Sequence, residues 1–200
     1  ASIAVEFKDF VTVLEAPLSE SRSLAVIEEV KKLIPNKPIK YLVNTHHHFD
    51  HSSGLRTYVA EGAAIVTHEV NKAFYQKTFK SPHTLIPDKL ELAKKKAVIE
   101  SFTDKKTITD GVRTIELYHI AGNLHNDGII MIHFPQEKML AVCDMFPRIP
   151  ADAPIPQPSP FTVNLIENLN RLKLDFDVIL PFHGTVTNKT ELMRVSGRGN

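Results

Sequence analysis

The feature that most constrains the fold of this chain is the alternation of short apolar runs with helix-like segments in its first half. Ile39 to Val43 and Ala63 to Thr67 are short runs dominated by apolar residues. Ser19 to Ile34 and His68 to Phe79 carry apolar residues at helical spacing, and Ser19 suits an N-cap. Strands that alternate with helices are typical of βαβ units around a buried, largely parallel sheet. The sequence therefore predicts an α/β fold.

The remaining segments, at the start of the chain and in its second half, are predicted to be mostly strands. The opening segment suggests a hairpin of Ile3 to Phe7 and Phe10 to Leu14, and later strands are expected at Ala97 to Phe102, Thr107 to Thr109, Arg113 to His119, Gly128 to Phe134, Met139 to Val142 and Val178 to Leu180. Further helices are predicted at Thr162 to Leu172 and after Thr187 or Asn188, and Pro147 to Pro160 reads as an irregular loop. We expect one domain over residues 1–200, because 42% hydrophobic content in 200 residues can bury one sizeable core.

Charge and composition narrow the range of partners. The chain has 24 Lys and Arg against 23 Asp and Glu, a formal net charge of +1, which argues against nucleic acid or anionic membrane as a partner. The short run Lys94 to Lys96 reads as a solvated surface rather than a phosphate track. With no apolar run of ~18–20 residues and no signal-peptide leader, we expect a soluble protein of the cytoplasm or periplasm. A small-molecule substrate is expected, and the sequence leaves homo-oligomerisation open.

The run His46-His47-His48-Phe49-Asp50-His51 directly follows one of the predicted buried strands. The carboxyl ends of strands are where α/β sheets place their ligand sites. Because alternate residues of an extended segment point the same way, His46 and His48 can converge on one ion. Asp50 and His51, where the chain turns toward a helix, can face a neighbouring position. Imidazole and carboxylate ligands suit zinc, and also iron or manganese.

Three later residues can complete two metal shells, because each follows a predicted strand: His125, Asp144 and His183. The candidate ligands divide into His46, His48 and His125 for one ion, Asp50, His51 and His183 for the other, and Asp144 as the bridge. We therefore expect two Zn²⁺ ions, with iron or manganese as alternatives.

These residues resemble the H-x-H-x-D-H signature and the later His, Asp and His ligands of the metallo-β-lactamase superfamily, in identity, order and approximate spacing. The resemblance extends from the first strand through His183. It implies a four-layer αβ/βα sandwich of two mixed β-sheets flanked by helices, with the metals at one edge. Members usually begin with another strand or two before the segment that matches Ile3 to Phe7, so we expect a chain trimmed at its N-terminus.

Neighbouring residues have simpler interpretations. His47 points away from its neighbours, so we expect it to pack or to support a ligand. Cys143 could supply a thiolate ligand, as in β-lactamases of this fold, but an aspartate such as Asp144 is the commoner pattern in non-lactamase members. Structural roles are expected for the remaining histidines, which show no converging partners: His68, His83, His119 and His133.

Two divalent ions close together lower the pKa of a shared water toward neutrality, which provides a hydroxide nucleophile. We expect Asp50 and Asp144 to hold and orient it, with Asp50 as the catalytic residue of a metal-dependent hydrolase. The residues expected to line a substrate pocket are Phe49, Phe146, Arg148, Phe161 and Phe182. The expected substrate is a small neutral or apolar electrophile: a lactone, ester, thioester, amide or isothiocyanate-like compound.

Three alternatives to this hydrolase stay open. The first is β-lactamase activity at the same site. A β-lactamase of this family is expected to carry a lysine three residues after the downstream metal ligand, where this chain has Pro147 followed by Arg148. The superfamily also includes mononuclear non-haem iron dioxygenases that act on thiols or persulfides through two histidines and one aspartate. The third alternative is a metal-binding domain without catalysis.

Overall fold

The computed structural model describes residues 1–146, 154 and 157–197. The chain divides into two compact units. The first unit comprises Ala1–Thr103 with Asp110–Val112, and the second comprises Asp104–Thr109 with Arg113–Asn200. Each unit contains one β-sheet and its own helices, and each contributes candidate ligands.

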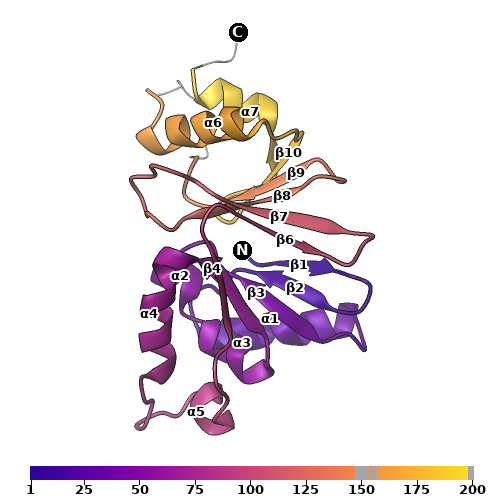
Figure 1. Ribbon diagram of the computed structural model, residues 1–200, viewed down its shortest axis with the longest axis vertical. Helices are drawn as coiled ribbons and strands as arrows, with labels where there is room; N and C mark the ends of the chain where they lie inside the picture. The colour runs from indigo at the N-terminus through magenta and orange to yellow at the C-terminus, as the bar shows by residue number, and fades with distance from the viewer. Residues whose placement is uncertain (147–153, 155–156, 198–200) are drawn as a thin grey trace. The chain divides into compact units, whose positions relative to one another are not determined.

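The first unit is built on a five-stranded sheet (Figure 1). Its strands are β1 (Ile3–Glu6), β2 (Val11–Leu14), β3 (Ile39–Val43), β4 (Ala64–His68) and β5 (Ile99–Phe102). They lie in the order β1-β2-β3-β4-β5, with β1 and β2 antiparallel and all later neighbours parallel. The sheet is therefore mixed, and the parallel strands β2, β3 and β4 end at the same edge.

The helices of the first unit are α1 (Glu20–Leu33), α2 (Phe49–Ser52), α3 (Leu55–Glu61), α4 (Glu69–Lys80) and α5 (Lys89–Ala93). Polar caps fix several ends: the Ser19 side chain accepts the backbone N–H of Arg22 at the start of α1, and Gly62 ends α3 in the left-handed region, at φ 108°. Side chains of α1, α3, α4 and α5 share one hydrophobic core with the sheet.

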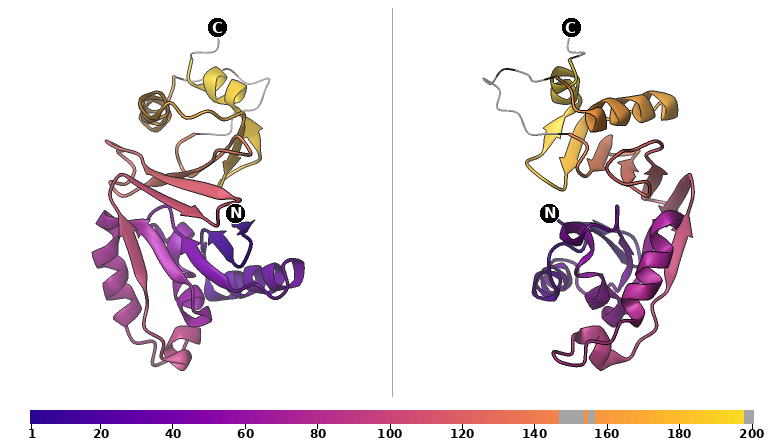
Figure 2. Two further views of the ribbon diagram at one scale, coloured as in Figure 1. Left: turned by 45° about the vertical axis from the view of Figure 1, so that its right-hand side comes forward. Right: turned by 90° about the vertical axis from the view of Figure 1, so that its left-hand side faces the viewer.

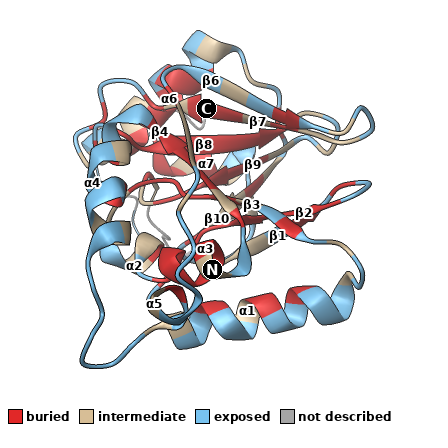
Figure 3. Cartoon of the chain, turned by 60° about the horizontal axis from the view of Figure 1, so that its bottom comes forward, coloured by how far each residue is buried: buried red, intermediate tan, exposed pale blue. Residues whose placement is uncertain are grey.

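Helix α1 shows why this core forms. Its buried residues are Ser23, Ile27 and Val30, which recur at helical spacing and form one stripe. Figure 3 shows this narrow buried stripe on a helix that is otherwise exposed. The amphipathic pattern therefore sets which side of α1 packs on the sheet.

The second unit is built on a six-stranded sheet. Its strands are β6 (Lys105–Thr109), β7 (Thr114–His119), β8 (Ile130–Phe134), β9 (Met139–Val142), β10 (Val178–Pro181) and β11 (Thr187–Asn188). They lie in the order β11-β10-β9-β8-β7-β6, and only the pair of β9 and β10 is parallel. Helices α6 (Pro160–Leu172) and α7 (Lys189–Val195) lie on one side of this sheet (Figure 2).

The predicted fold class is confirmed: the protein is α/β, with two mixed sheets flanked by helices. Strands Ile39 to Val43 and Met139 to Val142 have the predicted bounds, and most other elements differ by a residue or two. The sequence did not predict the short helix α2 or the two-residue strand β11. The predicted loop from Pro147 to Pro160 lies largely outside the described residues. No helix in the described part of the chain is long and apolar enough to cross a membrane.

Candidate functional site

The histidine run follows β3 at the carboxyl edge of the first unit's sheet. Its backbone is tied to neighbouring segments: the Ala16 N–H donates to the His51 carbonyl at 3.1 Å, and the Gly54 N–H donates to the Ala16 carbonyl at 2.9 Å. A Cβ atom added at Gly54 would lie 1.9 Å from the Ser23 hydroxyl oxygen, so only glycine fits this close approach. The turn that carries the histidines is thus held against the segment that follows β2.

Three histidine rings of this run gather on one side of the loop. The ring centroids of His46 and His48 are 4.5 Å apart, and those of His46 and His51 are 4.4 Å apart. Nε2 of His51 lies 3.5 Å from a carboxylate oxygen of Asp50. The first unit therefore brings together all four of the ligands that the sequence predicts in this run.

Glu15, which was not among the predicted site residues, contacts this loop through its side-chain carboxylate. Its side chain is fully buried, and one carboxylate oxygen accepts the Thr45 N–H at 2.6 Å while the other lies 2.7 Å from Nδ1 of His51. A carboxylate only accepts hydrogen bonds, so this contact requires a proton on Nδ1 of His51, which in the neutral imidazole places the lone pair on Nε2. Glu15 lies in the left-handed region at φ 70°, uncommon for a residue that is not glycine. No spacing rule pointed to it, because it is distant in sequence from the histidines.

Helix α4 supports the same loop from another direction. The Asn44 side-chain amide donates to the His51 carbonyl at 3.0 Å, and the hydroxyl of Tyr75 donates to the Asn44 side-chain oxygen. Burial raises the pKa of Tyr75, and the nearby Glu15 carboxylate raises it further, so the phenol stays a donor. Nδ1 of His47 lies 3.0 Å from the side-chain oxygen of Asn71, so His47 connects the loop to α4.

The second unit places two predicted histidine ligands, His125 and His183, beside the carboxylate of the third, Asp144. One oxygen of Asp144 lies 3.3 Å from Nε2 of His183, and the other oxygen lies 3.5 Å from Nε2 of His125. Asp144 comes from the segment after β9, His183 from the segment after β10, and His125 from the connection between β7 and β8. The two carboxylate oxygens of Asp144 thus face the imidazoles of two different histidines.

Local structure fixes these three side chains. Asp144 lies in the left-handed region at φ 50°, which aspartate tolerates better than most residues. The side-chain oxygen of Asn123 accepts the His125 N–H at 2.9 Å, and the Asn123 amide donates to Asn164 of α6 at 2.9 Å. Gly184, at φ 107°, turns the chain directly after His183. The loop that carries His125 is therefore tied to α6.

The distances between candidate ligand atoms within each unit suit side chains that share one metal ion better than side chains joined by hydrogen bonds. Two atoms bound to one tetrahedral zinc ion at ~2.0–2.1 Å lie about 3.3 Å apart. The three separations of carboxylate oxygens from Nε2 atoms are 3.3, 3.5 and 3.5 Å, longer than an ordinary N–H···O hydrogen bond. The side chains able to hold a metal include all seven predicted ligands, together with Cys143, which is buried beside Asp144. The donor set therefore suits a divalent transition metal.

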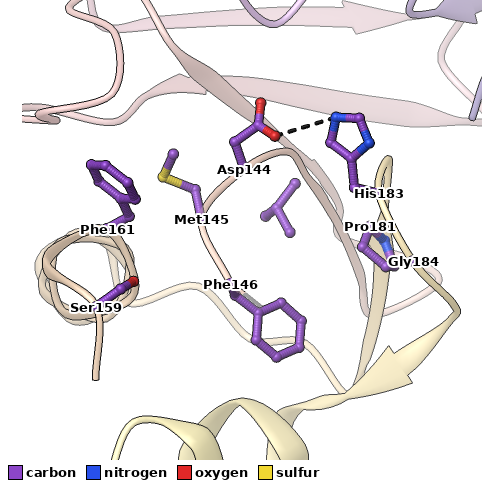
Figure 4. Close-up of a pocket in the computed structure, with 9 residues that line it drawn as sticks. Asp144, Met145, Phe146, Ser159, Phe161, Pro181, His183 and Gly184 are labelled. Carbon is purple, nitrogen blue, oxygen red and sulfur yellow. Dashed lines mark ion pairs between the residues drawn. The ribbon is translucent and has the colours of Figure 1, made fainter. Parts of the chain in front are cut away.

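A cavity of about 420 Å³ opens beside the ligands of the second unit (Figure 4). Its polar lining includes Asp144 and His183, and the larger, mostly apolar part comes from Val142, Met145, Phe146, Phe161 and Pro181. The Phe161 ring also packs edge-on against the His125 ring, with 5.5 Å between the centroids. Two of the predicted pocket residues, Phe146 and Phe161, thus line one cavity.

The other predicted pocket residues do not line this cavity or lie outside the described residues. Phe182 is buried in the second unit, and its backbone N–H donates to the Val142 carbonyl at 2.9 Å. Phe49 belongs to the first unit and is 72% exposed. Arg148 lies outside the described residues.

Three of the remaining histidines make local structural contacts. The His68 side chain accepts the backbone N–H of Val70 at the start of α4. Nε2 of His119 lies 2.8 Å from the Asp127 carbonyl oxygen, and Nε2 of His133 lies 2.8 Å from the Asp175 carbonyl oxygen. These contacts agree with the structural roles expected for them.

Comparison with known proteins gives one consistent result. A family model for the metallo-β-lactamase superfamily matches residues 2–183. A metallo-β-lactamase from Pontibacter korlensis is 19% identical with a TM-score of 0.72, over 98% of this chain and 84% of that one. The DIM-1 metallo-β-lactamase is 16% identical with a TM-score of 0.71, over 99% and 85%. A metallo-β-lactamase from Hirschia baltica is 16% identical with a TM-score of 0.68, over 98% and 83%. At these identities the likeness concerns the fold, and no curated protein matches the chain.

Proposed function

This chain belongs to the metallo-β-lactamase superfamily, whose members are mostly metal-dependent hydrolases, and we propose that it is a di-zinc hydrolase acting on a small neutral or apolar electrophile. The observation that carries the proposal is the position of Asp144, whose two carboxylate oxygens face the Nε2 atoms of two different histidines. A carboxylate whose two oxygens face different imidazoles is able to bridge a pair of divalent ions.

The proposed ligand sets are those that the sequence predicts. His46, His48 and His125 would hold one ion, Asp50, His51 and His183 the other, and Asp144 would join them. The proposal is supported by the geometry within each unit, where the ligand atoms already lie at separations suited to a shared ion. It is supported as well by Glu15, because a buried carboxylate on Nδ1 orients the imidazole and makes Nε2 a better ligand.

When bound, the two ions would supply a hydroxide nucleophile at neutral pH and polarise the electrophile. The chain's own residues would do the rest. The Asp50 carboxylate would orient the attacking water, accept the proton that this water loses as the hydroxide forms, and pass that proton to the leaving group. Asp50 is suited to this role because its side chain is partly exposed, whereas the neighbouring ligands His46 and His51 are buried.

The cavity in the second unit supports the proposed substrate class. Its volume of about 420 Å³ is in the range of small-molecule sites. The described residues that line it include two phenylalanines and no lysine or arginine. An apolar acyl or leaving group next to Asp144 and His183 would fit this lining better than an anionic one.

The test is a hydrolysis screen on protein whose metal content has been measured. The panel contains lactones, esters, thioesters, amides, isothiocyanates and β-lactams. The proposal predicts two zinc ions per chain and turnover of at least one uncharged substrate, lost on chelation and restored by zinc. Turnover confined to β-lactams would replace the proposed substrate class with β-lactamase activity. One iron per chain with oxygen consumption on a thiol or persulfide would overturn the hydrolase, and bound zinc without turnover would leave only metal binding.

A further inference from the structure

A second cavity, of about 470 Å³, lies in the first unit and involves none of the candidate metal ligands. One wall is a stripe of α4 formed by Lys72, Gln76, Phe79 and Lys80. The other wall is the segment 95–99, which runs from the end of α5 into β5. The cavity is therefore built from one helix face and one connecting segment of the same unit.

The lining of this cavity is strongly cationic. Four lysines contribute to it, Lys72, Lys80, Lys95 and Lys96, and none of its described lining residues is acidic. Lys72 is paired with Glu69 at 3.3 Å, whereas no ion pair to an acidic side chain is found for the other three within the described ranges. The whole chain has a net charge of only +1, so this is a local concentration of positive charge.

The cavity also has an apolar part. Phe79, Ala97 and Ile99 line it, and all three are partly buried against the hydrophobic core of the first unit. Phe79 additionally stacks on Tyr75, with 6.0 Å between ring centroids. The side-chain amide of Gln76 adds a group that can both donate and accept a hydrogen bond.

We propose that this cavity binds a small organic phosphate with an apolar or aromatic portion, such as a mononucleotide. Lysine ammonium groups bind phosphate as point charges. Several of them around one cavity favour a ligand with more than one negative charge. The Phe79 and Ile99 side chains provide a surface for a flat or apolar group, and the volume is in the range of small-molecule sites.

The sequence alone indicated no such site, because the run Lys94 to Lys96 is short and resembles an ordinary solvated surface. The structure adds two lysines from α4 to Lys95 and Lys96. Nζ of Lys95 lies beside the C-terminal end of α3, 3.6 Å from where a Cβ atom at Gly62 would stand. Lys80 and Lys96 are exposed, and within the described residues their side chains show no comparable close approach to another helix. These two lysines are therefore the ones to substitute.

The experiment measures binding of ADP to the zinc-loaded protein by titration calorimetry, with pyrophosphate and adenosine as separate probes. We expect one ADP per chain, weaker binding of pyrophosphate, no detectable binding of adenosine, and weaker ADP binding at higher salt. The double variant K80A/K96A should weaken ADP binding at least about tenfold. Lys77→Ala is the matched control, because Lys77 is an exposed lysine of the same helix outside the cavity lining.

Several outcomes would overturn the proposal. Absence of ADP binding would do so, as would full binding by K80A/K96A or an equal loss in the Lys77→Ala control. If the zinc ions held ADP instead, ADP binding would be lost in Asp144→Asn and retained in K80A/K96A. That result would also overturn the proposal. Pyrophosphate binding as tight as ADP binding would show that the apolar part of the cavity contributes nothing.

Discussion

The two units supply their candidate ligands in different ways. In the first unit all four ligands come from one continuous run, residues 46–51, and a buried network behind the run holds it in place. In the second unit three ligands come from three separate segments, and the Asp144 carboxylate lies between the two histidines. In the first arrangement the supporting carboxylate, Glu15, lies outside the predicted ligand set, whereas in the second the central carboxylate, Asp144, is itself a predicted ligand.

This difference has an energetic consequence. A ligand run supported by hydrogen bonds outside the metal shell is preorganised, so little is lost when the ion leaves. Ligands that meet around one carboxylate lose their common partner when its charge is removed. We therefore expect substitutions in the second unit to affect metal content more than substitutions behind the first.

The largest effect is expected for Asp144→Asn. Asparagine tolerates the left-handed backbone at φ 50°, so the change removes the charge and preserves the conformation. We expect loss of both metal ions and a fall in kcat of at least ~10³-fold, since both proposed shells use this carboxylate. Metal analysis and turnover measure it, with Asp175→Asn, an exposed carboxylate of the same unit, as control. A variant that keeps two zinc ions would contradict the bridging role.

Asp50→Asn is expected to have the next largest effect. The fold and the first ion should be retained, while the second ion binds more weakly and kcat falls ~10²–10³-fold. Turnover and zinc stoichiometry are measured beside the control Asp9→Asn, which changes an exposed aspartate of the same unit. Unchanged turnover in Asp50→Asn would refute the assigned catalytic role.

Glu15→Gln tests the support behind the first unit's ligands. The change removes the charged acceptor on Nδ1 of His51, so zinc affinity should fall ~10–100-fold while the metal ligands themselves are intact. Competition with a chelator measures the affinity, and circular dichroism checks the fold. Glu6→Gln, at an exposed ion pair of the same unit, should change nothing. Equal affinities in the two variants would show that the buried network does not orient His51.

Phe161→Leu should affect substrate binding more than chemistry. Phe161 lines the cavity of the second unit and contacts the His125 ring, but supplies no ligand atom. We expect KM to rise roughly three- to tenfold for apolar substrates, with kcat changed less. Steady-state kinetics measure this, and Leu124→Ala, an exposed residue of the same unit, is the control. An unchanged KM would remove this cavity from the substrate site.

The smallest effect on activity is expected for Asp88→Asn. This substitution is expected to lower the free energy of unfolding and not turnover. The hydrogen bond from Arg56 lowers the pKa of Asp88, and the Arg56 guanidinium also donates to the carbonyl oxygens of Thr78 and Ser81 at 3.1 Å. A lowered pKa means that this stabilisation is present above the ordinary pKa of 3.8 and is lost as the pH falls through the folded-state value.

Asparagine preserves the cap of α5, so Asp88→Asn removes only the charge. At neutral pH the free energy of unfolding should fall by about 2 kcal/mol, with turnover unchanged below the melting transition. The difference from the unsubstituted protein should shrink below about pH 4. Denaturant melts at several pH values measure it, and Glu29→Gln, at an exposed pair, should have almost no effect. A difference that is constant with pH would contradict the ionic origin.

Much of the fold was predictable because its strands and helices have strong local signals. Ser19 marks the start of α1, and the apolar runs mark β3 and β9. The short elements were missed: α2 is one turn within the histidine run, and β11 has only two residues, too few for a periodic pattern. The candidate ligands could be named because histidine and aspartate follow strands at recognisable places.

The residues that support the ligands could not be predicted in the same way. Glu15 and Tyr75 are remote from the histidine run in sequence, and their roles arise from how β2 and α4 pack beside β3 and β4. Glutamate after a strand and tyrosine on a helix are ordinary residues in their own segments. Only the tertiary structure brings them to His51 and Asn44.

The close approach at Gly54 makes the amino acids at two distant positions interdependent. Any side chain at position 54 would collide with the hydroxyl group of Ser23 on α1, and would also come within 3.1 Å of the carbonyl oxygens of Ala16 and Ser19. A larger residue at position 54 thus requires the Ser23 hydroxyl to move and the two carbonyl groups to shift by a few tenths of an ångström. The residues tolerated at position 54 and at position 23 therefore depend on each other, which couples α1 to the loop that carries the candidate ligands.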